Sequence, residues 1–196
     1  AQGRDYAVIM IHQTRQGGRD SNNGWSDTKL RYGPVTVAYD GTTNNSVYKI
    51  KEVSKVGVID GTNGSRLDKT GQTMNIVNDS QDDNFSIGFW TYDISALKAV
   101  GATVTSANVN VNVKTVGNDC TGLSFYYGTN SASDAITSGK SLPDSIKGTN
   151  DKHLDQAKEY FGLQNSLIKT VEKADVKVGT YTIDIAAAIN ASIAAD

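Results

Sequence analysis

Cysteine, histidine and long apolar runs are scarce in this sequence, and each scarcity excludes a class of protein. Cys120 is the single cysteine, which rules out an internal disulfide and a zinc site built from several thiolates. It stands between Asp119 and Thr121, where we expect a turn carrying a solitary thiol, with an intermolecular disulfide as the minor alternative. No apolar run approaches the roughly 20 residues that a membrane-spanning helix requires, so the sequence predicts no membrane span.

An excess of charge of one sign is lacking as well. Lys and Arg together number 19 and Asp and Glu number 21, for a net charge of -2. Such a chain has no basic surface for nucleic acid or for an anionic membrane, so we expect no nucleic-acid partner. Hydrophobic residues make up 38% of the 196 residues, enough for the core of one large β-sandwich. The polar character comes from Asn, Thr, Ser and Gly, as in secreted β-rich domains.

Motifs of known catalytic chemistry are absent. The two histidines, His12 and His153, are far apart in sequence, and there is no Gly-x-Ser-x-Gly elbow, phosphate-binding loop or His-Glu-x-x-His helix. Ser95–Lys98 and Ser166–Lys169 match the Ser-x-x-Lys pattern of some acyl-transfer enzymes, but a chain rich in both residues gives such matches by chance. We therefore predict that the chain is not an enzyme. A polysaccharide-active enzyme that uses two of the scattered Asp carboxylates is the remaining alternative.

Alternating apolar and polar residues predict strands along most of the chain. The clearest case is Ala107–Val113, where the Val residues face inward and the intervening Asn residues face solvent. Many short strands separated by turn signals predict an all-β fold, a jelly-roll β-sandwich with one or two short helices. Helical segments are expected at Ser95–Gly101, Lys152–Phe161 and Ala186–Ala195. The other expected strands are Thr28–Tyr32, Pro34–Tyr39, Ser46–Val53, Lys55–Ile59, Gln72–Val77, Phe85–Ile94, Leu123–Tyr127, Leu167–Glu172 and Gly179–Ile185.

The segment Tyr6–His12 is the most hydrophobic strand and is apolar on both faces. Alternation places one set of side chains on each face: Tyr6, Val8 and Met10 against Ala7, Ile9 and Ile11. In a two-layer sandwich one face of each strand meets water, so this strand needs a second cover. That cover is a loop or helix of the same chain, or another subunit. We accordingly divide the chain into an N-terminal strand, residues 1–13, which can act as a donor strand, and a single sandwich domain, residues 14–196.

An acidic segment is the best candidate for a metal site. Asn78–Asn84 supplies three carboxylates, from Asp79, Asp82 and Asp83, together with amide oxygens. Hard cations such as Ca²⁺ take six to eight oxygen ligands of these types. The segment lacks the glycine and terminal Glu of an EF-hand loop, and Asp is also a common turn residue. Calcium is therefore the one cofactor that we associate with this sequence.

Aromatic and amide side chains offer a second kind of site. Trp25 follows Asn22 and Asn23 in a polar loop, where its ring can face a sugar or pack against the rim of the sandwich. Trp90 alternates with Phe89 in a strand, so the two rings face opposite ways. One of them can be exposed or at an interface, but for Trp90 a position in the core is the favoured alternative. Five Asn-x-Ser sequences are compatible with a glycosylated surface protein: Asn44, Asn63, Asn78, Asn84 and Asn190.

Three stretches resemble a known family, the DNRLRE-type, carbohydrate-module-like jelly rolls. Asp20–Gly33 is similar to the family's opening motif, and Tyr181–Ile185 is similar to its closing strand. Ile87–Val113 resembles its central signature, in which Asp93–Leu97 and then Gly101–Ala107 follow a core strand. Together they cover about a third of the chain. The resemblance implies a jelly roll in an extracellular setting and brings no catalytic residues. A similar architecture serves cannula, bundling-pilus and biofilm-matrix fibre subunits.

Two functional hypotheses follow. In the first, the chain is an extracellular structural subunit that assembles with copies of itself into a surface filament or tube, with Tyr6–His12 added to the sheet of the next subunit. In the second, it is a non-catalytic carbohydrate-binding or adhesive module whose partner is a polysaccharide and whose ligand-facing residues are Trp25, Asn22 and Asn23. Ala1 reads as the residue left after removal of a signal peptide, which places the protein outside the cell or at its surface; the alternative is a trimmed chain.

Overall fold

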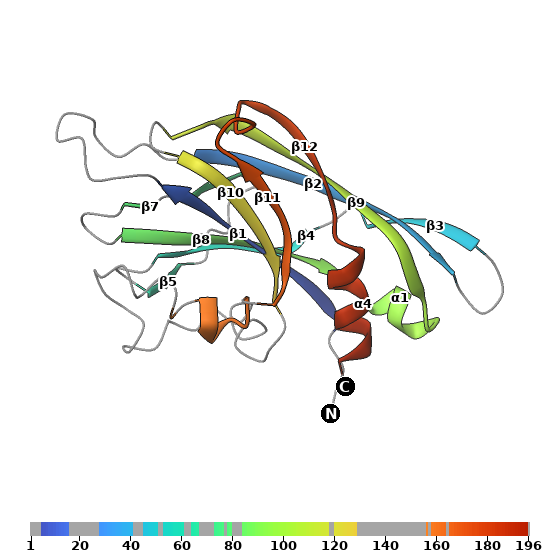
Figure 1. Ribbon diagram of the computed structural model, residues 1–196. Coiled ribbons are helices and arrows are strands. Elements are labelled where there is room, and N and C mark those ends of the chain that lie inside the picture. The colour runs from blue at the N-terminus through green and yellow to red at the C-terminus, as the bar shows by residue number, and fades with distance from the viewer. Residues whose placement is uncertain are drawn as a thin grey trace.

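Two antiparallel β-sheets pack face to face, with short helices at one end (Figure 1). The structure is a computed structural model, and the all-β sandwich predicted from the sequence is confirmed. The residues that it describes are 5–15, 28–40, 45–50, 53–60, 64–66, 73–76, 78–79, 84–117, 120–128, 156, 158–163 and 165–195.

The larger sheet, sheet A, takes the first strand of the chain into its middle. Its order is β11-β10-β1-β8-β4-β5, and β7 pairs with β8 off this path. β1 is antiparallel to both β10 and β8, so these two neighbours run parallel to each other. The strands are β1 (Tyr6–Arg15), β4 (Val53–Asp60), β5 (Gly64–Arg66), β7 (Asn78–Asp79), β8 (Asn84–Asp93), β10 (Cys120–Tyr127) and β11 (Leu167–Glu172).

The smaller sheet, sheet B, is built around two long strands that pair with each other. Its order is β12-β9-β2-β3, with β6 also paired to β2. The strands are β2 (Thr28–Asp40), β3 (Asn45–Ile50), β6 (Thr73–Ile76), β9 (Thr103–Thr115) and β12 (Gly179–Asp184). The chain passes repeatedly from one sheet to the other: between β1 and β2, β3 and β4, β5 and β6, β6 and β7, β8 and β9, β9 and β10, and β11 and β12. This alternation is typical of a jelly roll.

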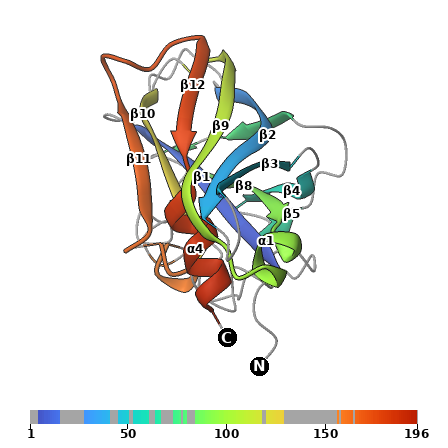
Figure 2. The same ribbon diagram turned by 90° about the vertical axis from the view of Figure 1, so that its right-hand side faces the viewer.

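The predicted helices differ in how much of each the structure describes. α1 (Ser95–Ala99) and α4 (Ala186–Ala194) form where helical segments were expected, and α4 lies across the end of the sandwich next to α1 (Figure 2). Of the expected helix Lys152–Phe161, residues 156 and 158–160 are helical, and residues 152–155 and 157 lie outside the described residues.

Two predicted strands are a single strand in the structure. Thr28–Tyr32 and Pro34–Tyr39 were expected to be separate, but both belong to β2. The pairing of β2 with β9 shifts between Tyr32 and Val35, at the Gly-Pro pair. Proline has no N–H to give to the ladder, so it interrupts the pairing, yet its fixed φ is compatible with an extended chain that continues as one strand.

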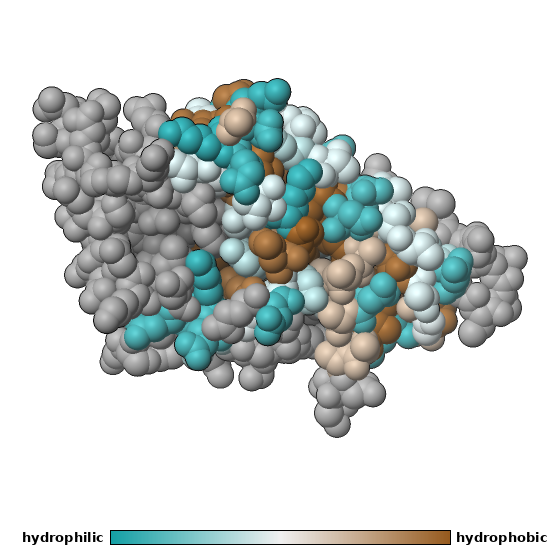
Figure 3. All heavy atoms as spheres, viewed as in Figure 1, coloured by the Kyte–Doolittle hydropathy of each residue, from teal (hydrophilic) through white to brown (hydrophobic). Residues whose placement is uncertain are grey.

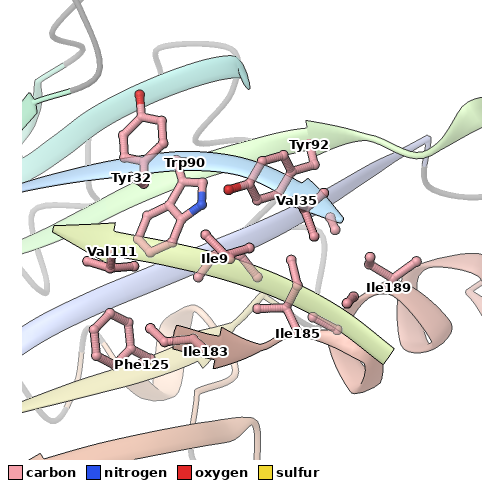
Figure 4. Close-up of a cluster of buried hydrophobic side chains, with 14 of the residues drawn as sticks. Ile9, Tyr32, Val35, Trp90, Tyr92, Val111, Phe125, Ile183, Ile185 and Ile189 are labelled. Atoms are coloured by element: carbon pink, nitrogen blue, oxygen red, sulfur yellow. The ribbon is translucent and has the colours of Figure 1, made fainter. Parts of the chain in front are cut away.

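Side chains from both sheets fill the space between them. In β9, Val109, Val111 and Val113 are buried, whereas Asn108 and Asn110 are exposed, as the alternation predicts. Figure 4 shows Val111 together with side chains from sheet A, from β12 and from the start of α4. The core of the molecule is therefore shared by the two sheets and closed at one end by α4.

Candidate assembly site around strand β1

The N-terminal strand lies in the interior of sheet A, where it is paired on both sides. Ile9 is opposite Trp90 of β8 and Tyr127 of β10, and Met10 is opposite Phe89 and Tyr126. The predicted assembly residues therefore lie together in one strand between two neighbours. Val8, Ile9, Met10 and Ile11 are all buried, and Tyr6 is opposite Asp93 at the start of the ladder.

One face of β1 forms part of the core between the sheets. Ala7, Ile9 and Ile11 belong to this core and are completely buried. Ile9 lies near Trp90, Val35 and Ile185 (Figure 4). A strand with three such residues fits where the opposite sheet covers it, so this face determines which side chains of β1 point inward and disfavours a one-residue shift of its register.

The opposite face of β1 has a second, separate cover. Val8 and Met10 are 2% and 0% exposed, yet they lie outside the core between the sheets. The same is true of three other buried residues: Phe89 on the neighbouring strand, Phe161 and Leu163. Residues 158–163 lie on this outer side of sheet A (Figure 1). β1 is apolar on both faces and therefore needs a cover on its outer face. Residues 158–163 of the same chain provide part of that cover.

Both aromatic residues at the centre of β8 are buried, so neither is left for a surface. Phe89 faces the outer cover, and Trp90 lies in the core, where its ring stacks on Tyr32 at 5.2 Å between centroids with 5° between the planes. Among the described residues, Trp90 Nε1 has no hydrogen-bond partner. The core position that the sequence favoured for Trp90 is confirmed, and the alternative of one exposed ring is wrong because both rings are fully buried.

Tyr92 joins the two sheets through its hydroxyl group. Its Oη donates a hydrogen bond of 2.7 Å to the carbonyl oxygen of Gly33, at the irregularity in β2. Burial raises the pKa of the Tyr92 phenol well above its ordinary value, and the neighbouring Trp90 side chain opposes this effect only in part. Tyr92 is consequently a neutral, structural hydrogen-bond donor over the whole physiological pH range.

The end of β1 and the start of β2 lie at the same end of the sandwich. Arg15 is opposite Cys120, whose N–H donates to the carbonyl of Gly117 at 3.0 Å, and Gly117 N–H donates to Thr28 Oγ1 at 3.0 Å. We call this group, Arg15, Thr28, Gly117 and Cys120, the hinge end. Figure 1 shows the end of β1 and the starts of β2 and β10 on the left, at the end of the sandwich away from α1 and α4.

Cys120 is a buried strand residue and not part of a turn. It opens β10, and its Sγ donates to the carbonyl of Gly122 at 3.4 Å. Burial raises the pKa of the thiol above its ordinary value. The turn prediction was wrong because the polar neighbours of Cys120 obscured the beginning of the strand. A buried thiol with a raised pKa is unreactive, so this geometry does not favour an intermolecular disulfide.

The other end of β1 is held by α4 and by the start of α1. α4 packs against β1 and β9. The Asn190 side chain accepts a hydrogen bond from Val104 N–H and donates one to the Val104 carbonyl, both at 2.9 Å. Ile94 N–H donates to the carbonyl of Asp5 at 2.7 Å. Of the five Asn-x-Ser sequences, Asn190 therefore has both amide atoms engaged within the fold.

The predicted calcium residues are only partly described. Asp79 pairs with Asn84 in the β7–β8 ladder, so the acidic segment forms a hairpin, and Asp82 and Asp83 lie in its connection outside the described residues. Within the described part of the chain, no group of three His, Cys, Asp or Glu side chains could hold a metal ion. The calcium site stays a prediction.

The ligand-facing residues of the alternative hypothesis, Trp25, Asn22 and Asn23, also lie outside the described residues. His153 does too, whereas the backbone of His12 lies in β1 opposite Ser124.

In neither Ser-x-x-Lys match does the serine hydroxyl bond to the lysine of the same match. Ser95 Oγ donates to Asp93 at 2.6 Å. Ser166 Oγ donates to the carbonyl of Gly162 at 3.3 Å, while Lys169 Nζ donates to the carbonyl of Thr182 at 3.4 Å. Both serines therefore serve local structure at the ends of elements.

Apolar side chains on the described surface are scattered. Figure 3 shows hydrophilic and hydrophobic residues interspersed over the face seen in Figure 1. The large hydrophobic residues that are exposed in the described part are Val100, Tyr160, Leu167 and Val178, which come from different elements.

Comparisons with known proteins suggest no function for this chain, so any functional proposal has to rest on the fold and the site. No protein-family model, no curated protein and no solved structure matches the chain. No helix among the described residues is long and apolar enough to cross a membrane.

Proposed function

We propose that the chain is an extracellular structural subunit that assembles into a surface filament or tube by exchanging β1 between copies. The observation that supports this most directly is the position of β1. It is the first strand in the sequence, yet it lies between β8 and β10, which come much later in the chain. Without β1, sheet A has a gap lined by two strands with unpaired backbone N–H and C=O groups, and β1 of another copy restores the same pairs.

Burial gives the exchanged strand a large energetic role. Val8, Ile9, Met10 and Ile11 are at most 2% exposed. Burying side chains of this size contributes about 1.5–3 kcal/mol each, so the four together contribute roughly 6–12 kcal/mol. A copy with an empty gap is therefore strongly destabilised. The closed chain and the exchanged assembly form the same contacts, so their balance depends on protein concentration and on the connection to β2.

The connection between β1 and β2 is suited to exchange. It comprises residues 16–27, and its sequence is rich in Gly, Asn and Ser. Its two ends, Arg15 and Thr28, lie at the hinge end. A shorter connection would be enough to join Arg15 to Thr28 within one copy. The additional residues therefore allow β1 to reach another copy. The extracellular setting is supported by the composition, which is rich in Asn, Thr, Ser and Gly.

A disulfide trap distinguishes exchange from a closed chain. In a Cys120→Ser background, Val8→Cys and Thr91→Cys place thiols at directly opposite positions of β1 and β8. In an exchanged filament this disulfide joins two chains, and non-reducing gels show a ladder of covalent multimers. The matched control, Thr36→Cys with Asn108→Cys, joins β2 and β9, which both stay in one chain, and gives only the monomer band.

Microscopy and light scattering complete the test. The full chain is compared with a variant lacking residues 1–13, each with calcium and with a chelator, and filaments are expected only for the full chain. Addition of a peptide of residues 5–15 to the shortened variant is expected to restore its thermal stability. A full chain that stays monomeric in every condition, or filaments whose trapped disulfide is entirely within one chain, would refute the proposal.

A further inference from the structure

The direction in which β1 enters a neighbouring subunit is set by its ladders. It must be antiparallel to both β8 and β10, with Ala7, Ile9 and Ile11 toward sheet B. A donated strand therefore takes the same register as the chain's own strand. Its Arg15 emerges at the hinge end of the accepting copy, beside that copy's Thr28.

The connection then limits how far apart two hinge ends can be. Twelve residues, 16–27, join Arg15 to Thr28, and thirteen fully extended steps reach at most about 45 Å. β2 and β9 have 13 residues each, which makes the sandwich about 43 Å long in the direction of its strands. With neighbouring strands about 4.8 Å apart, the same body is only about 25–30 Å wide across its sheets.

These lengths separate two ways of building a filament. If copies are stacked end to end, successive hinge ends are one body length apart, and the connection has to be fully stretched with no allowance for a curved path. If copies lie side by side, the hinge ends are about 30 Å apart, well within reach.

We infer that exchanging copies of this chain lie side by side, with their strands across the filament axis and all their hinge ends on one side. This inference rests on the proposed exchange of β1 and specifies the surface at which a second copy joins. Each contact is head-to-tail in the sense of donor and acceptor, so it propagates into a fibre or a tube when the rotation between copies does not close a ring. The connections line one side of that assembly, and α1 and α4 lie on the other.

Shortening the connection measures the distance that it has to span. Deletion of residues 16–18 leaves ten steps, or about 34 Å, and deletion of residues 16–21 leaves seven steps, or about 24 Å. We expect the full chain and the first variant to form filaments, and the second to form none. Electron microscopy of the filaments should give a repeat of about 30 Å per subunit. A variant in which Gly-Ser-Gly replaces residues 16–18 is the control, and it should match the full chain.

The outcomes separate this inference from the proposed function. A repeat of about 43 Å per subunit, with filaments already lost on deletion of residues 16–18, would overturn the side-by-side arrangement while leaving the exchange intact. Closed dimers that carry the interchain disulfide would also overturn it, since they indicate reciprocal exchange. If the full chain forms neither filaments nor an interchain disulfide, the proposed function itself fails. Urea unfolding of the monomeric fractions confirms that the shortened chains still fold.

Discussion

Replacement of Met10 by alanine tests whether the outer face of sheet A is covered in solution. Met10 is 0% exposed, although it points away from the core between the sheets. The substitution removes three non-hydrogen atoms, which at about 0.8 kcal/mol per buried methylene-sized group amounts to about 2.4 kcal/mol. The cavity left behind adds to this cost, so we expect a loss of about 3–4 kcal/mol in the free energy of unfolding.

Urea unfolding of monomeric protein, followed by far-UV circular dichroism, measures this loss. Ile9→Ala is the matched control, because Ile9 is equally buried on the other face of the same strand. If Met10→Ala changes the free energy by less than about 0.5 kcal/mol while Ile9→Ala keeps its full cost, the outer face is open to water and our description of a two-sided strand is refuted.

A double-mutant cycle identifies what covers this face. Phe161 is 1% exposed and lies in the segment on the outer side of sheet A. If it packs over β1, the effects of Met10→Ala and Phe161→Ala are not additive, and the coupling energy exceeds about 0.5 kcal/mol. Additive effects would assign the cover of Met10 to another part of the chain.

Three further predictions concern other parts of the molecule. Because burial raises the pKa of Tyr92, its contribution to stability is fully present below about pH 10 and is lost above it, by up to about 1.4 kcal/mol per pH unit. Urea titrations between pH 8 and 11 should show that Tyr92→Phe reduces this slope. Asn190→Ala should cost about 2–3 kcal/mol and lower the Tm, since both backbone groups of Val104 lose their partner. If the acidic hairpin binds calcium, the ion raises the Tm of the chain, and the double substitution Asp82→Asn, Asp83→Asn abolishes the rise.

Each of these predictions has a control in the same chain. Tyr160→Phe, the same substitution at an exposed tyrosine, is the control for Tyr92→Phe. Ala187→Ser changes an exposed position of α4 and should be nearly neutral. Asp175→Asn, an exposed aspartate far along the chain from the hairpin, should keep the calcium response. An unchanged slope for Tyr92→Phe, a neutral Asn190→Ala, or equal calcium responses in both Asp variants would contradict the corresponding prediction.

Local patterns were sufficient to predict most of the strands and the fold class. The alternation in Ala107–Val113 predicted a half-buried strand, and β9 buries the Val residues and exposes Asn108 and Asn110. Leu167–Glu172 was predicted with the bounds that β11 has. Such patterns depend on near neighbours in the sequence, and side-chain alternation is a property of a single strand.

Pairings between distant segments could not be predicted in this way. The apolar sequence of β1 indicated two covered faces, but it did not indicate that β8 and β10 would be its neighbours or that residues 158–163 would lie on its outer side. The nearness of Arg15 and Thr28 also follows only from the topology. Cys120 was misplaced because polar residues on either side of it concealed the beginning of a strand.

The position of Trp90 makes it an optical reporter of whether the gap between β8 and β10 is filled. Its indole ring is directly opposite Ile9, buried among side chains that include one face of β1. Whenever the gap between β8 and β10 is vacant, water reaches the ring and its emission shifts to longer wavelength. When a strand fills the gap, whether from the same chain or from another, the emission returns to shorter wavelength. Departure and arrival of the strand can thus be timed without any added dye.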